Sequence, residues 1–153
     1  MRRLVRASAF ALLFLLPAAY AAESIATTDG EMPGLRLEVQ ELKAVSGGAV
    51  MLRYTVINDS DQVFGLNEAL KEQGSIDWHG TDGVYLVDLA GKKKYPVVRD
   101  AEKHCLCSRN VADLAAKSSA SFWAKFPAPP EGVQKIGVVV PHFIPLDDVP
   151  LAR

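Results

Sequence analysis

The residues best suited to chemistry in this chain form the run His104-Cys105-Leu106-Cys107, which holds both of its cysteines. In a regular strand, residues two apart lie about 6.6 Å from each other with both side chains on one face, at the limit of disulfide geometry. We therefore expect a disulfide between Cys105 and Cys107, made possible by a turn of the backbone. A ring this short contributes on the order of 1.6 kcal/mol through chain entropy. Its expected role is to hold residues 99–110 in one shape.

Two other kinds of chemistry remain open for the same residues. A strained C-x-C disulfide has a raised reduction potential and could exchange with other thiols. Reduced Cys105 and Cys107 could instead bind a soft metal, copper(I) or zinc, together with His104 and with His79 or His142 as a further ligand. Unpaired thiols are the last alternative.

A second group of polar residues lies in the irregular segment 62–83. Asp77, His79 and Asp82 surround Trp78 and raise the question of a metal or acid–base site. No further carboxylate or histidine motif of recognisable spacing accompanies them, and the chain lacks the G-x-S-x-G element of a hydrolase. We therefore interpret these four residues as part of a hydrogen-bonded surface loop that could bind a partner. Neither an enzyme nor a cofactor is expected.

The N-terminus predicts the compartment in which this chemistry takes place. Three arginines precede an apolar run over residues 7–16, and Ala19-Tyr20-Ala21 follows as an A-x-A cleavage site. We expect residues 1–21 to be a signal peptide and the mature protein to be periplasmic or secreted. The apolar run is shorter than the roughly 20 residues that cross a bilayer, so no membrane span is expected after cleavage. An oxidising compartment also favours paired cysteines.

Charge and length constrain the remainder of the chain. Without the three arginines of the signal, 14 Lys+Arg face 18 Asp+Glu, a formal charge near −4. This acidic balance argues against a nucleic-acid-binding surface. Residues 22–34 are small and polar and predict a flexible leader. Residues 35–153 are sufficient for one domain with its own core.

Short apolar alternations separated by turn residues predict strands throughout this domain. A phase slip near Gln40-Glu41 predicts a β-bulge in the first of them, and residues 67–72 offer one helical turn. The pattern favours an all-β fold, an immunoglobulin-like antiparallel β-sandwich of about seven strands. The expected strands cover residues 35–44, 49–57, 84–89, 93–98, 119–126, 136–140 and 143–151.

The same alternation predicts which side chains fill the space between the two sheets. Trp123 is interpreted as a core or sheet-surface residue rather than a ligand platform. Residues 143–151 are expected at a sheet edge, because Pro145 and Pro150 would be excluded from a central strand. The residues expected in the core are Leu52, Tyr54, Val56, Phe122, Phe126, Val138 and Val140.

Several short motifs connect the second half of the chain to a known group of proteins. They include Cys105-Leu106-Cys107-Ser108, Trp123-Ala124-Lys125-Phe126 and the continuation Pro127-Ala128-Pro129-Pro130. With them, residues 84–150 resemble uncharacterised exported bacterial proteins that share a C-L-C-S … W-A-x-F-P-A-P-P pattern. The resemblance implies an immunoglobulin-like sandwich outside the cytoplasm and implies no particular reaction.

The sequence thus supports two hypotheses about function. In the first, the protein is an exported, non-catalytic module, in the cell envelope or secreted, that binds an envelope protein or a wall component through loops 62–83 and 99–113. In the second, it is a periplasmic thiol-redox or soft-metal protein that uses Cys105 and Cys107.

Overall fold

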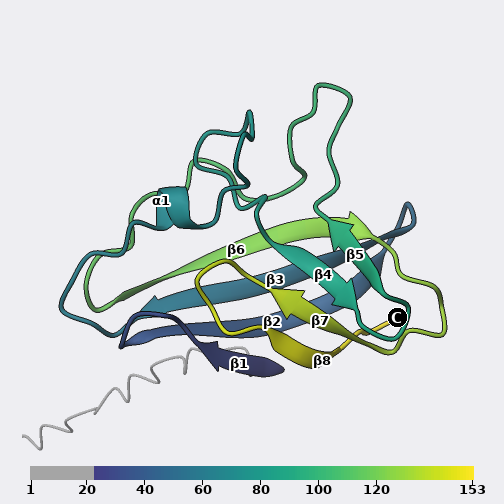
Figure 1. Cartoon of the computed structure of the whole chain (residues 1–153), viewed down its shortest axis with the longest axis horizontal. Coiled ribbons are helices and arrows are strands. Elements are labelled where there is room, and N and C mark those ends of the chain that lie inside the picture. The colour runs from purple at the N-terminus through teal and green to yellow at the C-terminus, as the bar shows by residue number, and fades with distance from the viewer. Residues whose placement is uncertain (1–22) are drawn as a thin grey trace, which may run out of the picture.

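Two antiparallel four-stranded sheets form the protein (Figure 1). The computed structural model describes residues 23–153, so the expected signal peptide lies outside the described residues. The strand order is β1-β2-β3-β6 in the first sheet and β5-β4-β7-β8 in the second. The elements are β1 (Ala26–Asp29), β2 (Leu35–Val45), β3 (Ala49–Asn58), α1 (Leu66–Ala69), β4 (Tyr85–Asp88), β5 (Lys93–Pro96), β6 (Ser118–Pro127), β7 (Lys135–Val139) and β8 (Leu146–Pro150). This arrangement confirms the all-β sandwich, with eight strands in place of about seven.

The first sheet is built around β3, which pairs along its whole length with β2 and β6. Buried residues alternate with more exposed ones in all three strands, so that one face of the sheet packs in the core and the other faces solvent. The register of β2 against β3 shifts between Val39 and Glu41, which confirms the predicted bulge. The extra residue lets Leu42, after the bulge, turn inward like Val39 before it.

The core lies between the two sheets, as the alternation predicted. All seven residues expected there are at most 8% exposed. The rings of Tyr54 and Phe122, opposite each other on β3 and β6, pack with centroids 5.6 Å apart. Burial raises the pKa of Tyr54, whose hydroxyl has no hydrogen-bond partner within residues 23–153. Thr81 of the 62–83 loop is also fully buried, so that loop rests on the core of the sandwich.

The prediction of a flexible leader over residues 22–34 is wrong for Ala26–Asp29, which form β1. Ala26 to Asp29 pair in register with Val39 to Arg36 of β2, and Ile25 N–H donates to the Val39 carbonyl at 2.7 Å. This segment lacks the apolar alternation of a typical strand. It is ordered through its backbone, because main-chain groups can pair whatever side chains they carry.

The C-terminal residues join the two sheets at the border of the sandwich where β1 and β8 lie. β8 lies at the edge of its sheet as predicted, with Val149 and Leu151 buried and Asp147 exposed. After β8 the chain crosses to β2, where Ala152 N–H donates to the Leu42 carbonyl at 2.9 Å. Residues 23–153 include no helix long and apolar enough to cross a membrane.

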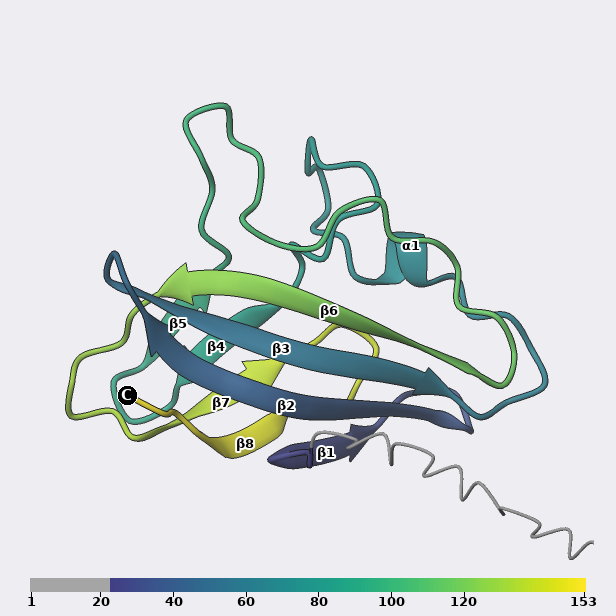
Figure 2. The same cartoon turned by 180° about the vertical axis from the view of Figure 1, so that it is seen from behind.

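The opposite side of the sandwich, bordered by β5 and β6, carries the long connections. Residues 62–83 and 99–113, together called the loop cluster below, project beyond the sheets there (Figures 1 and 2). α1 belongs to the first of them and supplies the helical turn expected at residues 67–72, shifted slightly toward the N-terminus.

Candidate functional site

The predicted disulfide between Cys105 and Cys107 is present at the base of the loop cluster. The chain bends at Leu106, which brings the two Cα atoms to 5.3 Å, inside the range that a disulfide needs. Both cysteines are only 4% exposed and belong to the hydrophobic core. The bridge is thus an internal crosslink of the loop cluster rather than an accessible pair of sulfurs.

The segment that carries the disulfide is held by hydrogen bonds on both sides. Lys125 N–H of β6 donates to the Leu106 carbonyl, and Ser108 N–H donates to the Trp123 carbonyl, both at 2.9 Å. On the other side, Leu106 N–H donates to the Val98 carbonyl at 2.8 Å. The segment therefore extends the first sheet beyond β6 and ties it to the chain that leaves β5.

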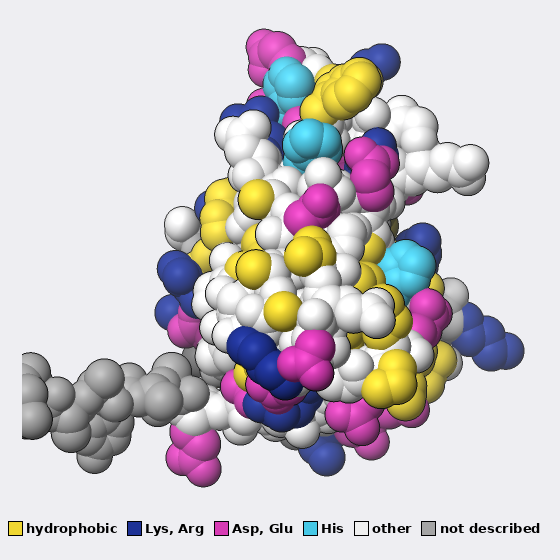
Figure 3. All heavy atoms as spheres, turned by 90° about the vertical axis from the view of Figure 1, so that its left-hand side faces the viewer, with side chains coloured by type: hydrophobic (Ala, Val, Ile, Leu, Met, Phe, Trp, Pro, Cys, Tyr) yellow, Lys and Arg dark blue, Asp and Glu magenta, His cyan; other side chains and the backbone are white. Residues whose placement is uncertain are grey.

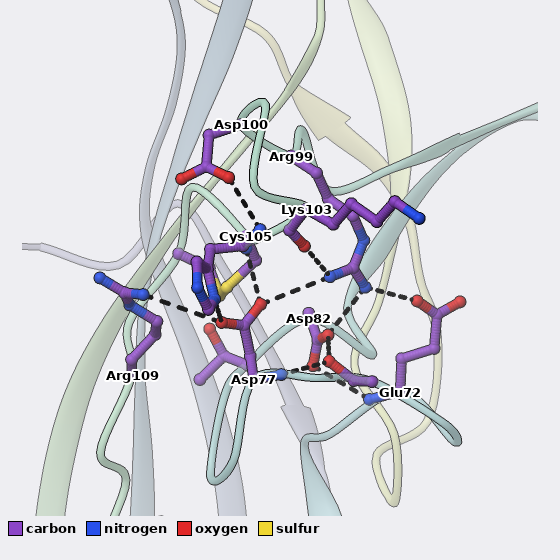
Figure 4. Close-up of polar contacts among 12 residues, drawn as sticks. Glu72, Asp77, Asp82, Arg99, Asp100, Lys103, Cys105 and Arg109 are labelled. Atoms are coloured by element: carbon purple, nitrogen blue, oxygen red, sulfur yellow. Dashed lines mark hydrogen bonds and ion pairs between the residues drawn. A yellow bond between two sulfur atoms is a disulfide. The ribbon is translucent and has the colours of Figure 1, made fainter.

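Asp77 links the two halves of the loop cluster through a buried carboxylate (Figure 4). Its side chain is 1% exposed and accepts hydrogen bonds from Cys105 N–H at 2.7 Å and from His104 Nδ1 at 2.8 Å. Arg109 Nη1 lies 3.8 Å from its Oδ1. Burial raises the pKa of Asp77, but the hydrogen bonds from Cys105 and His104 and the positive charges of His104 and Arg109 outweigh it. The net result is a lowered pKa.

Asp82 forms a second buried junction a few residues further on. Its carboxylate is fully buried and accepts hydrogen bonds from Glu72 N–H at 3.1 Å and from the Ser75 hydroxyl. Arg99 Nη2 donates to Asp82 Oδ2 at 2.8 Å and to Glu72 Oε2 at 2.8 Å. Its other amino group, Nη1, donates to the Lys103 carbonyl at 3.1 Å and lies 3.4 Å from Asp77 Oδ2.

Arg99 therefore bridges both buried carboxylates (Figure 4). Burial lowers the pKa of Arg99, but the hydrogen bonds and negative charges of Asp82 and Glu72 raise it above the usual value for the side chain. A planar guanidinium with several donors suits such a shared position, because it can serve several acceptors without moving.

Backbone contacts bind the two loops together along their length. Val111 N–H donates to the His79 carbonyl at 2.9 Å, and Thr81 N–H donates to the Ser108 carbonyl at 3.1 Å. At the base of the first loop, Gly83 N–H donates to the Leu70 carbonyl, and a Cβ on Gly83 would lie only 2.9 Å from that oxygen. The loop cluster is thus a single crosslinked unit.

The structure brings only some of the predicted site residues together. Asp77 lies beside His104 rather than His79, whose imidazole is half-exposed and 3.9 Å from Glu68. The interpretation of Asp77 and Asp82 as members of a hydrogen-bonded loop is correct, but they are buried within it and not on its surface. Trp78, by contrast, is 78% exposed.

The sequence analysis assigned no role to two residues that shape the site. Arg99 is the first, although an arginine next to a loop rich in acids is a natural partner for their carboxylates. Asn58 is fully buried at the end of β3 and donates to the carbonyls of Gln62, Leu114 and Ala115, so it ties the bases of both loops. A polar residue that ends a buried strand was the available clue.

The geometry offers little to a bound metal. Within residues 23–153, no three or more His, Cys, Asp or Glu side chains are grouped in a way that could hold one. Of the set His104, Cys105 and Cys107, the two sulfurs are bonded to each other, and the Nδ1 atom of His104 is engaged with Asp77.

The exposed end of the loop cluster presents an apolar and basic surface over the buried carboxylates. Ile76, Trp78, His104, Arg109 and Asn110 line an open cleft of about 380 Å³ with Asp77 beneath them. Figure 3 shows hydrophobic and histidine side chains together at this end of the molecule, with acidic and basic groups around them. A protruding indole beside a guanidinium is the side-chain pair that is enriched where proteins bind other molecules.

No protein-family model, curated protein or solved structure matches this chain. Its function is therefore inferred from the geometry of the described residues.

Proposed function

We propose that this protein is an exported, non-catalytic binding module, periplasmic or secreted, that engages an envelope protein or a wall component through the exposed end of the loop cluster. One observation carries the proposal: Trp78 is 78% exposed, although its neighbour Asp77 is fixed in the interior by four polar contacts. An indole that lies in solvent, next to a residue anchored in the interior, buries little apolar area in the core of the fold.

The crosslinks of the loop cluster also support a binding function, because they reduce the conformational entropy that the loops would lose on binding. Ordering a loop on binding costs free energy, and that cost falls when the loop already has its bound shape. Asp77, Arg99 and the disulfide fix the backbone around Trp78 before any partner arrives. Rigid support under an exposed aromatic anchor is the arrangement expected of a binding loop.

Export is the second part of the proposal and has its own test. The arginines, apolar run and A-x-A site of residues 1–21 support it, as does a disulfide that suits an oxidising compartment. N-terminal sequencing of protein recovered outside the cytoplasm should begin at Ala22. Recovery of all of it with Met1 retained would contradict export.

The binding function is tested by comparing Trp78→Ala with Leu89→Ala. Leu89 is a matched control, because it is 69% exposed but lies in the turn after β4, outside the loop cluster. Each protein is immobilised, incubated with envelope extract, and the retained components are quantified by mass spectrometry. A component that the wild type and Leu89→Ala retain equally, and that Trp78→Ala loses at least about tenfold, supports the proposal. Equal retention by all three proteins would contradict it.

A further inference from the structure

The outer face of the first sheet contains a hollow. It lies over β2, β3 and β6, on the face turned toward the viewer in Figure 2, and has a volume of about 480 Å³. Its floor is low because two short side chains, Thr55 and Ser121, stand opposite each other there, with their hydroxyls hydrogen-bonded at 2.8 Å. Longer side chains rise around them on neighbouring strands.

One wall of the hollow is aromatic and the others are polar. Trp123, 36% exposed, stands beside the floor on β6, directly across from Arg53 on β3. Glu38 and Gln40 of β2 line the other side. A bound molecule would therefore meet one flat apolar ring together with hydroxyl, amide, carboxylate and guanidinium groups.

The charges around the hollow are already compensated within the sheet. Arg53 Nε lies 3.3 Å from Glu41 Oε2, and Arg36 Nε lies 3.2 Å from Glu38 Oε1. Both charged residues that line the hollow, Arg53 and Glu38, thus have a counter-charge beside them, and neither is left unpaired for an ionic ligand. The complementary ligand is neutral, rich in hydrogen-bonding groups, and has a flat face of C–H groups for the indole.

We propose that this hollow binds a neutral carbohydrate chain, with one pyranose ring stacked on Trp123. A pyranose combines the two required properties, because its axial C–H bonds form an apolar face while its hydroxyls radiate from the ring edge. Thr55 and Ser121 then meet the hydroxyls from below, and Arg53, Glu38 and Gln40 meet them from the sides. The site is open, so a single ring is bound weakly, and the continuous sheet surface suits a polymer.

This site is distinct from the binding surface proposed for the loop cluster, and either one could exist without the other. It is located on regular strands, which hold side chains more firmly than loops do. Trp123 is the aromatic residue of the sheet site and Trp78 is that of the loop cluster. Because these are the only tryptophans in the chain, the two sites can be observed separately.

The experiment uses Trp78→Phe protein, whose fluorescence comes from Trp123 alone. Chitotriose, cellotriose and maltotriose are added separately up to about 20 mM, which covers the millimolar range of weak binding. We expect a saturable change in Trp123 emission with at least one trisaccharide. The half-saturation concentration should change less than about twofold between low and high salt, because no net charge is involved. Calorimetry of the wild type should give the same affinity.

Two further variants localise the binding. Trp123→Ala removes the stacking surface, and Ser121→Ile fills the floor with a residue that favours strands while it keeps the indole. Both should weaken trisaccharide binding at least tenfold in calorimetry, with melting temperatures near that of the wild type.

Three results would overturn the proposal. The first is that none of the trisaccharides binds the wild type. The second is that binding persists in both Trp123→Ala and Ser121→Ile. The third is that hexaproline, tested in parallel, saturates Trp123 while the sugars do not, which would make the hollow a peptide site.

Discussion

The backbone N–H of Cys105 donates a 2.7 Å hydrogen bond to the buried carboxylate of Asp77, 28 residues earlier in the chain. The disulfide segment and the loop that presents Trp78 are therefore held by the same contact. Loss of either partner should disturb both loops, whereas the sheets beneath them have their own hydrogen bonds and core.

Replacing Asp77 by Ala should destabilise the protein by about 3 kcal/mol, because Cys105 N–H and Arg99 would lose a buried acceptor. Chemical denaturation gives the global value. Relative to the wild type, the substitution should accelerate hydrogen exchange more in the loop cluster than in β3. Asp147→Ala is the control, since Asp147 is exposed and should change stability by less than about 0.5 kcal/mol. Equal stability of the two variants would show that the buried carboxylate contributes nothing.

The lowered pKa of Asp77 predicts a specific pH dependence. A carboxyl group whose pKa is lower in the folded state stabilises the protein above its unfolded pKa, here 3.8, and that stabilisation is lost as the pH falls through the folded value. The difference in unfolding free energy between wild type and Asp77→Asn should therefore be constant near neutral pH and shrink below about pH 4. Parallel curves for the two proteins down to pH 2 would be inconsistent with this linkage.

The double variant Cys105→Ala with Cys107→Ala should lower global stability by about 2 kcal/mol, close to the entropy contribution of a short ring. The local effect should be larger, with faster proteolysis within residues 99–113. Limited proteolysis and denaturation of the same samples separate the two effects. Intact mass of exported wild-type protein, alkylated without reductant, should show no modified cysteine. Two alkylated thiols would mean that the bridge does not form in the cell.

Neighbouring residues of β6 provide a test of the strand's orientation. Phe126 is fully buried, and Phe126→Ala should cost about 3 to 5 kcal/mol of unfolding free energy through the cavity that it leaves. Lys125 faces outward, and Lys125→Ala should change that free energy by less than about 0.5 kcal/mol. Similar melting temperatures for the two variants would show that the inward face of β6 is assigned incorrectly.

The sheets could be predicted because side-chain alternation in a strand is a local property. The bulge at Gln40-Glu41 and the inward side chains of β6 follow from the order of polar and apolar residues alone, whereas β3 carries apolar residues on both faces, as a central strand does. β1 could not be found in this way, because its short polar residues are ordered by pairing with a distant segment. A mobile leader and a paired polar strand have the same composition.

The candidate site was predicted less completely, because its contacts join residues far apart in the chain. Proximity in sequence favoured a group that contains Asp77 and His79, whereas the fold pairs Asp77 with His104, 27 residues away in the chain. The disulfide could be predicted because its two cysteines are near neighbours. Arg99 could not, since its three acidic partners come from a different loop and nothing local specifies which acids it will meet.

The pairing of residues 106–108 with β6 also protects the molecule from its own copies. An uncovered strand at the border of a sheet offers a row of unpaired amides and carbonyls to any other extended chain, which is a common route to aggregation and amyloid. Leu106 and Ser108 occupy these groups on Trp123 and Lys125. The crosslink beside them therefore has a consequence for solubility: without the bond between Cys105 and Cys107, this border of the sheet would be less well shielded against edge-to-edge association.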